Sequence, residues 1–199
     1  MNVRIYVEGG SEGSTKSNCR KAFRTFFEKV IQPGTFRVIA SGSRARAFQD
    51  FCSALREHRE DYILLLVDSE TAVGAAPWQH LNTRVGDNWQ RPGGASDDQA
   101  HLMVQVMEAW FLADQQALAE YYGQGFLRNS LPRRDNVEQI PKEKVFRVLR
   151  HASRGTQKGE YHKTRHGFDL LEQIDPSIVR AASHHANRLL LVLERETSG

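Results

Sequence analysis

The feature that most restricts the fold is the segment 62–67, YILLLV, which is apolar at every position. A short continuous apolar run bounded by charged residues is typical of a β-strand buried on both faces of a sheet. Two other β-prone runs precede it, VRIYV at 3–7 and TFRVIA at 35–40. Between these runs, apolar residues recur at helical spacing: first Cys19, Ala22, Phe23, Phe26, Phe27 and Val30, then Phe48, Phe51, Cys52 and Leu55. The alternation of strand and helix predicts an α/β fold, a Rossmann-like parallel sheet flanked by helices.

The second half of the chain is predominantly helical in pattern. A fourth strand is predicted at 101–106, followed by a helix from 108 to about 122. Further helices are predicted at the positions 142–151, 167–174 and 177–196, with a polar loop at 153–166. We expect residues 1–110 to form the α/β core, and residues 111–199 to form a helical extension packed on it in one compact domain.

The segment 71–100 shows little periodicity and carries two tryptophans, Trp78 and Trp89. A connection this long within a compact domain is usually functional or mobile. The tryptophans could form a lid or a partner surface, or they could belong to a small satellite core.

Composition restricts the cellular setting more than the activity. The net charge of +3 and the isoelectric point near 9.0 permit a polyanionic partner without establishing one. No apolar run is long enough to cross a bilayer, and the N-terminus lacks the pattern of a signal peptide. We therefore expect a cytoplasmic protein that does not associate with membranes.

Acidic residues follow two of the predicted strands. Glu8 and Glu12 lie in the loop VEGGSEG after the first strand, and Asp68 and Glu70 lie in DSE after the third. Because ligands of open α/β sheets bind at the carboxyl ends of the strands, we expect these carboxylates to converge. A divalent cation would neutralise their repulsion, and oxygen ligands suit Mg²⁺ or Mn²⁺. For Glu12, a solvated acid near a helix N-terminus is an equally good interpretation.

Two other polar residues are expected near this site. Ser69 lies between the two acids of the third-strand motif, and Glu108 precedes the helix that follows the fourth strand. Both could support the metal ligands. For Glu108 the alternative is an acid favoured in a first helical turn without any role in a site.

Cations that could bind phosphate are concentrated in KGEYHKTRH, residues 158–166. Clusters of this kind bind nucleic-acid backbones, and Tyr161 offers a stacking surface, although a charged run is also typical of a solvated loop. Two arginines at the start of the second helix could contribute as well. The candidate nucleic-acid-binding residues are Arg44, Arg46, Lys158, His162, Lys163 and Arg165.

The motifs VEGGSE and VDSE resemble those of Toprim domains in topoisomerases, primases and overcoming-lysogenization-defect nucleases. Those domains carry a glutamate–glycine loop after the first strand and D-x-D or D-x-E after the third. The resemblance spans about residues 1–110 and implies metal-dependent phosphodiester chemistry, with Glu8, Asp68 and Glu70 as catalytic acids. It also implies a lysine that stabilises transition-state charge, either Lys158, to which we assign the role, or Lys163.

The number of metal ions is left open by the resemblance. Two ions about 3.5–4 Å apart can stabilise the attacking and leaving oxygens of an in-line displacement. The longer side chain of Glu70, in place of an aspartate, leaves single-metal chemistry as an alternative.

Over its full length, the chain more closely resembles a compact bacterial Toprim-like family of unknown function, through HLMVQVMEAWFLAD, LP and KGEYHKTRH. Members of that family are often encoded beside an ABC-type ATPase, as in phage-defence systems. The resemblance implies a Mg²⁺- or Mn²⁺-dependent nuclease or nuclease subunit that acts on DNA or RNA in antiviral defence. The alternatives are a non-catalytic regulatory partner of an ABC-type ATPase, and an enzyme that acts on tRNA or nucleotides with the same metal site.

Overall fold

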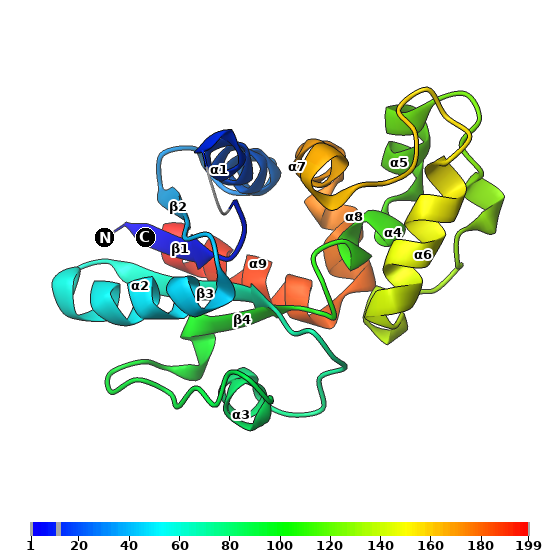
Figure 1. Ribbon diagram of the computed structural model, residues 1–199. Coiled ribbons are helices and arrows are strands. Elements are labelled where there is room, and N and C mark those ends of the chain that lie inside the picture. Colours follow the sequence, from blue (N-terminus) through cyan, green and yellow to red (C-terminus); the bar gives the residue numbers. More distant parts are fainter. Residues whose placement is uncertain (1, 11–12, 199) are drawn as a thin grey trace.

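The computed structural model describes residues 2–10 and 13–198, and within these ranges the chain forms a four-stranded parallel sheet in the order β2-β1-β3-β4 (Figure 1). The central strands are β1, Val3–Val7, and β3, Tyr62–Asp68. The edge strands are β2, Phe36–Ala40, and β4, Ala100–Met103. The predicted α/β class, with a parallel sheet flanked by helices, is confirmed.

Helices cover both faces of the sheet, which explains why β3 is apolar throughout. Successive strand residues point to opposite faces. Leu64 and Leu66 therefore pack in the core shared with α1, Gly13–Glu28, and α9, His184–Thr197. Ile63, Leu65 and Val67 belong to the second core cluster, on the opposite face, beneath α2 and α3. These two helices span Arg44–Glu57 and Pro77–Thr83.

The segment 71–100 packs against α2 instead of standing free. Both tryptophans are buried, and Trp89 stacks on Phe48 with ring centroids 4.4 Å apart. The Trp78 indole Nε1 donates a hydrogen bond to the Ser96 carbonyl at 2.9 Å. The interpretation of the tryptophans as a satellite core is therefore the one that the structure supports.

The helical extension lies beyond the carboxyl ends of the strands (Figure 1). Its helix α7 packs along α1, and α8 packs against α4 and α9. In the described part of the chain, no helix combines the length and apolar character needed to cross a membrane. The extension consists of α4, Ala109–Ala113, α5, Gln115–Tyr122, α6, Lys142–Ser153, α7, Lys163–Gln173, and α8, Pro176–Ala182. The helix α9, which lies within the residues 111–199 predicted as the extension, instead packs on the sheet against β4.

Side-chain caps divide two helices that periodicity predicts as continuous. The helix predicted from 108 to 122 is interrupted at Asp114, whose carboxylate accepts a hydrogen bond from Ala117 N at 3.1 Å. The helix predicted at 177–196 is likewise interrupted at Ser183, whose hydroxyl accepts from Ala186 N at 3.1 Å. Apolar spacing continues across both breaks because the flanking helices face the same core. In addition, α7 starts at Lys163, within the predicted polar loop.

Candidate metal centre

Three of the predicted acids converge at the carboxyl edge of the sheet. Strands β1 and β3 are parallel neighbours, with Val7 paired to Leu66, so Glu8 and Asp68 emerge side by side. Glu70 follows two residues later. One carboxylate oxygen from each of Glu8, Asp68 and Glu70 lies within 4.8 Å of the others. The fourth predicted ligand, Glu12, lies outside the described residues.

Backbone groups fix the orientation of these carboxylates. Glu8 Oε1 accepts a hydrogen bond from Asp68 N at 3.0 Å, and Asp68 Oδ1 accepts one from Met107 N at 2.7 Å. The backbone of Glu70 has φ of 67°, in the left-handed region that few non-glycine residues adopt. Its N–H donates to the carbonyl of Gln105 at 2.8 Å. The acids are therefore held in place by the folded backbone.

The electrostatics of the cluster favour a bound cation. Burial and the neighbouring Asp68 carboxylate raise the pKa of Glu8 to about 8, against its ordinary 4.5. Burial likewise raises the pKa of Asp68. A divalent cation would stabilise the ionised form of both groups, and carboxylate oxygens are the ligands that Mg²⁺ and Mn²⁺ prefer. The three acids therefore fit such an ion.

The raised pKa of Glu8 predicts a pH-dependent effect of Glu8→Gln on stability. Glu8 binds its proton more tightly in the folded state than in the unfolded state, so the metal-free protein loses stability as pH rises from about 4.5 to about 8. Glutamine carries no charge and escapes this loss. We expect the Tm advantage of Glu8→Gln, measured by thermal melts in EDTA, to grow by about 10 °C across this interval and then level off. The exposed Glu60→Gln is the control, and equal pH profiles for the wild type and Glu8→Gln would contradict the prediction.

The basic residue nearest the acids is Lys163. Its Nζ lies 3.7 Å from Asp68 Oδ2 and 3.8 Å from Glu108 Oε1, and its side chain is 57% exposed. Lys158, to which the resemblance gave the catalytic role, instead places its Nζ 4.6 Å from the centroid of the Tyr121 ring. The geometry favours Lys163 over Lys158 for a role at the acids.

Glu108 is buried beside the cluster, at the N-cap of α4. Its Oε1 accepts a hydrogen bond from the Tyr161 hydroxyl at 3.0 Å. Its Oε2 has no hydrogen-bond partner among the described residues. Burial raises the pKa of Glu108, and the Asp68 carboxylate adds to this effect while Lys163 opposes it. Glu108 and Asp68 thus share one lysine.

Arg44, a predicted nucleic-acid-binding residue, lines the cavity beside the acids and is bound by several groups of the protein. Its Nη1 donates to Glu8 Oε2 at 3.3 Å and also to the carbonyl of Asp68. Its Nη2 pairs with Asp87 Oδ2 at 2.7 Å, and the guanidinium lies 5.1 Å from the centroid of the Trp89 ring. Two residues of the segment 71–100, Asp87 and Trp89, therefore hold the arginine that orients Glu8.

In the described part of the chain, the side chains of the remaining predicted residues make no hydrogen bond or ion pair with the three acids. Arg46 pairs with Asp50 at 2.8 Å on α2. Ser69 turns its hydroxyl away, donating to the Thr71 carbonyl at 2.6 Å. His162 and Arg165 are exposed around the start of α7, and the His162 Nδ1 contacts the Thr164 hydroxyl at 3.0 Å.

Two residues of the site carry no local sequence signal. Lys142, the first residue of α6, forms an ion pair with Glu70, and its N–H donates to Gln105 Oε1 at 3.1 Å. Asp87, which holds Arg44, lies in the aperiodic segment. Both belong to the site only through contacts distant in sequence, so only the folded structure could identify them.

In the loop after β1, close packing requires a glycine at position 10. A Cβ at Gly10 would lie 2.6 Å from the Cα of Lys16, and φ is 68°. Gly13 has φ of 48° but open space around it. We expect Gly10→Ala to lower the free energy of unfolding by about 1–3 kcal/mol more than Gly13→Ala in urea titrations. Equal losses for the two variants would show that the contact with Lys16 is unimportant.

Two adjoining cavities open beside the acids. One, of about 190 Å³, is lined by Glu8, Arg44, Asp68 and Lys163 among others. The other, of about 220 Å³, shares Lys163 and Phe168 with it. A small polar substrate group could therefore reach the carboxylates past Lys163.

A protein-family model described as "Domain of unknown function (DUF4276)" matches residues 7–194, a range that includes Glu8, Asp68, Glu70 and Lys163. No curated protein and no solved structure matches the chain.

Proposed function

The chain belongs to the DUF4276 family of domains of unknown function, and we propose that it is a Mg²⁺-dependent nuclease or nuclease subunit related to Toprim domains. The observation that carries the proposal is the convergence of Glu8, Asp68 and Glu70 within 4.8 Å at the carboxyl edge of a parallel sheet. Lysine Nζ and carboxylate oxygens beside a small cavity suit a charged phosphodiester. The two acidic motifs, in the order and positions described above, support the Toprim relationship.

Each residue of the site has a distinct role in this proposal. Glu8, Asp68 and Glu70 would hold Mg²⁺ or Mn²⁺, which when bound supplies a Lewis acid that stabilises charge on phosphoryl oxygens. Arg44 orients Glu8, which would also accept a proton from the attacking water. Lys163 would contact the phosphate and compensate the charge that develops in the transition state.

Substrate comparison with the purified protein tests the proposal. Plasmid DNA, tRNA and free nucleotides would each be incubated with Mg²⁺, with Mn²⁺ or with EDTA. The proposal expects cleavage of a nucleic acid that requires the divalent ion. Cleavage restricted to free nucleotides would favour a nucleotide-specific enzyme. No cleavage of any substrate, by the protein alone or with an ATPase that co-purifies with it, would favour a non-catalytic regulatory partner.

The setting that we propose is antiviral defence in the cytoplasm, with an ABC-type ATPase as partner. It rests on the full-length resemblance to the Toprim-like family, whose members are often encoded beside such an ATPase. Co-expression with a neighbouring ATPase, followed by affinity purification, would test this partnership.

A further inference from the structure

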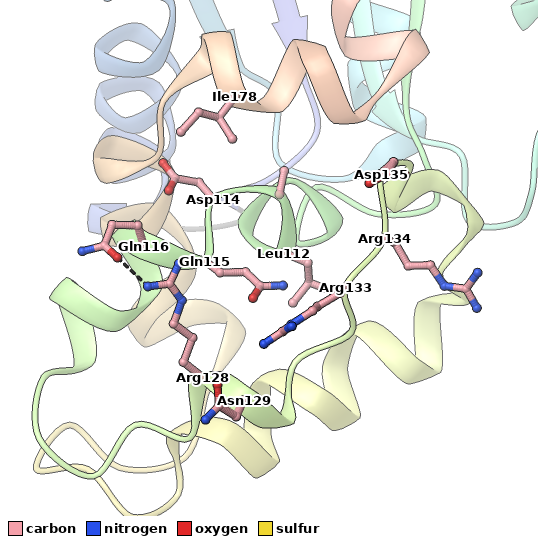
Figure 2. Close-up of a pocket in the computed structure, with 11 residues that line it drawn as sticks. Leu112, Asp114, Gln115, Gln116, Arg128, Asn129, Arg133, Arg134, Asp135 and Ile178 are labelled. Atoms are coloured by element: carbon pink, nitrogen blue, oxygen red, sulfur yellow. Dashed lines mark hydrogen bonds between the residues drawn. The ribbon is translucent and has the colours of Figure 1, made fainter.

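The largest cavity that we describe, about 690 Å³, lies in the helical extension, away from the acids (Figure 2). It opens at the end of α4 opposite Glu108, where the chain turns from α4 into α5. Its volume falls within the range typical of small-molecule sites, about 300–1,000 Å³. The lining residues are Leu112, Ala113, Asp114, Gln115, Gln116, Arg128, Asn129, Arg133, Arg134, Asp135 and Ile178.

Arginine side chains give this cavity affinity for anions. Arg133 extends into it toward Gln115, whereas Arg134 points away (Figure 2). Within the described part of the chain, Arg133 makes no ion pair or side-chain hydrogen bond. Arg128 donates from Nη1 to the neutral amide of Gln116 at 2.5 Å and pairs with no acid in the same part of the chain. Guanidinium groups left without a carboxylate suit phosphate, which they can bind through two parallel hydrogen bonds.

Two acids line the cavity, Asp114 and Asp135, and neither forms an ion pair with Arg128 or Arg133 in the part of the chain that the structure describes. Both carboxylate oxygens of Asp114 are engaged by backbone N–H groups, Oδ1 by Ala117 at 3.1 Å and Oδ2 by Asp175 at 2.9 Å. Asp114 is also buried. Its role is to join α5 and α8, and the arginines are free to bind an anion.

The rest of the lining suits a larger ligand than inorganic phosphate. Leu112, Ala113 and Ile178 supply apolar surface, and Ile178 is 42% exposed. The amide of Gln115 donates to the Pro132 carbonyl at 2.9 Å, which leaves its oxygen as an acceptor in the cavity lining. Apolar surface, amides and guanidinium groups together match the base and the phosphate of a nucleotide.

The charge of the surrounding segment also favours an anionic ligand. Residues 128–165 contain eleven lysines and arginines against four acids, a net charge of +7 in a chain whose total is +3. Arg147 and Arg150 are exposed on α6, and the exposed Arg154 directly follows this helix. The helix packs against η2, Arg128–Ser130, beside the cavity. Such segregation raises the local concentration of polyanions.

We propose that this cavity binds a nucleotide, either free or as one residue of a nucleic-acid strand, with its phosphate on Arg128 and Arg133. Binding there requires no metal ion and none of the three acids. Only the second source, a nucleic-acid strand, rests on the proposed nuclease function. The two sites can therefore be tested separately.

The test measures binding in EDTA, with ATP by calorimetry and a fluorescein-labelled 20-nucleotide DNA by anisotropy. The variant is Arg128→Glu with Arg133→Glu. Its matched control is Arg37→Glu with Arg59→Glu, which changes the net charge equally at exposed residues near the amino ends of the strands. The single variant Arg133→Gln replaces a guanidinium group that has no partner in the described part of the chain, so it should keep the fold. Thermal melts of each variant check that the fold is kept.

We expect the cavity variant to weaken the binding of at least one probe by at least about tenfold. Arg133→Gln should weaken the binding of the same probe measurably, and the control should weaken it by less than about threefold. ATP that binds and displaces the DNA identifies a free nucleotide as a ligand, whereas binding of DNA alone identifies a strand. Either result supports the cavity site when the cavity variant weakens the binding and the control does not. Equal affinities for the cavity variant and the control, or no binding of either probe to the wild type at about 1 mM, would overturn it.

Discussion

Asp68→Asn is expected to reduce the rate of Mg²⁺-dependent cleavage by about 10³-fold or more. Loss of a group that only hydrogen-bonds to a metal ligand costs roughly 10–100-fold in activity, and loss of a ligand should cost more. Asp68 is the most enclosed of the three acids, and its Oδ1 is already fixed by Met107 N at 2.7 Å. The amide keeps the shape of the side chain and removes the charge that would hold the ion. Initial rates under saturating Mg²⁺ measure this effect.

The matched control for this prediction is Asp50→Asn, which removes an acid that pairs with Arg46 on the surface of α2. Surface ion pairs contribute about 0–1 kcal/mol to stability, so this variant should keep its fold and its activity. Cleavage by Asp68→Asn at the rate of Asp50→Asn would remove Asp68 from the mechanism.

Lys163→Met is expected to lower the cleavage rate by about 10²-fold, the scale of losing one group that stabilises transition-state charge. The ammonium lies within 3.8 Å of both Asp68 and Glu108, and its side chain is 57% exposed. It can therefore move to an incoming phosphate. Methionine keeps the length and the apolar stem of lysine and removes only the charge.

Lys158→Met is the comparison that separates the two lysines of KGEYHKTRH. Its ammonium lies over the Tyr121 ring and contacts none of the three acids. One exposed cation–π contact is worth about 0.5–1 kcal/mol. We therefore expect the cleavage rate of Lys158→Met to lie within about threefold of the wild-type rate. A larger loss for Lys158→Met than for Lys163→Met would restore Lys158 to the role that the resemblance implied.

Much of the fold could be predicted from the sequence because its signals are local. The continuous apolar run of β3 and the helical spacing before it identify a parallel sheet without any knowledge of tertiary contacts. The positions of Glu8 and Asp68 at strand ends then follow from topology, since neighbouring parallel strands end at the same edge. The convergence of these two acids is a consequence of strand order.

The details of the site depend on contacts that no local pattern encodes. Lys142 reaches Glu70 from a helix that begins 72 residues later. Asp87 holds Arg44 from a segment without periodicity, and through this contact an arginine predicted to bind phosphate also orients Glu8. Similarly, the sequence identifies the cations of KGEYHKTRH but cannot show which of them faces the acids.

We propose that Glu8, Asp68 and Glu70 bind the same hard cation, and anomalous diffraction from a crystal soaked in Mn²⁺ would locate it. We expect a peak within about 2.5 Å of a carboxylate oxygen from each of Glu8 and Asp68, with Glu70 contributing directly or through water. A soaked crystal with ordered Glu8 and Asp68 side chains and no peak between them would contradict it.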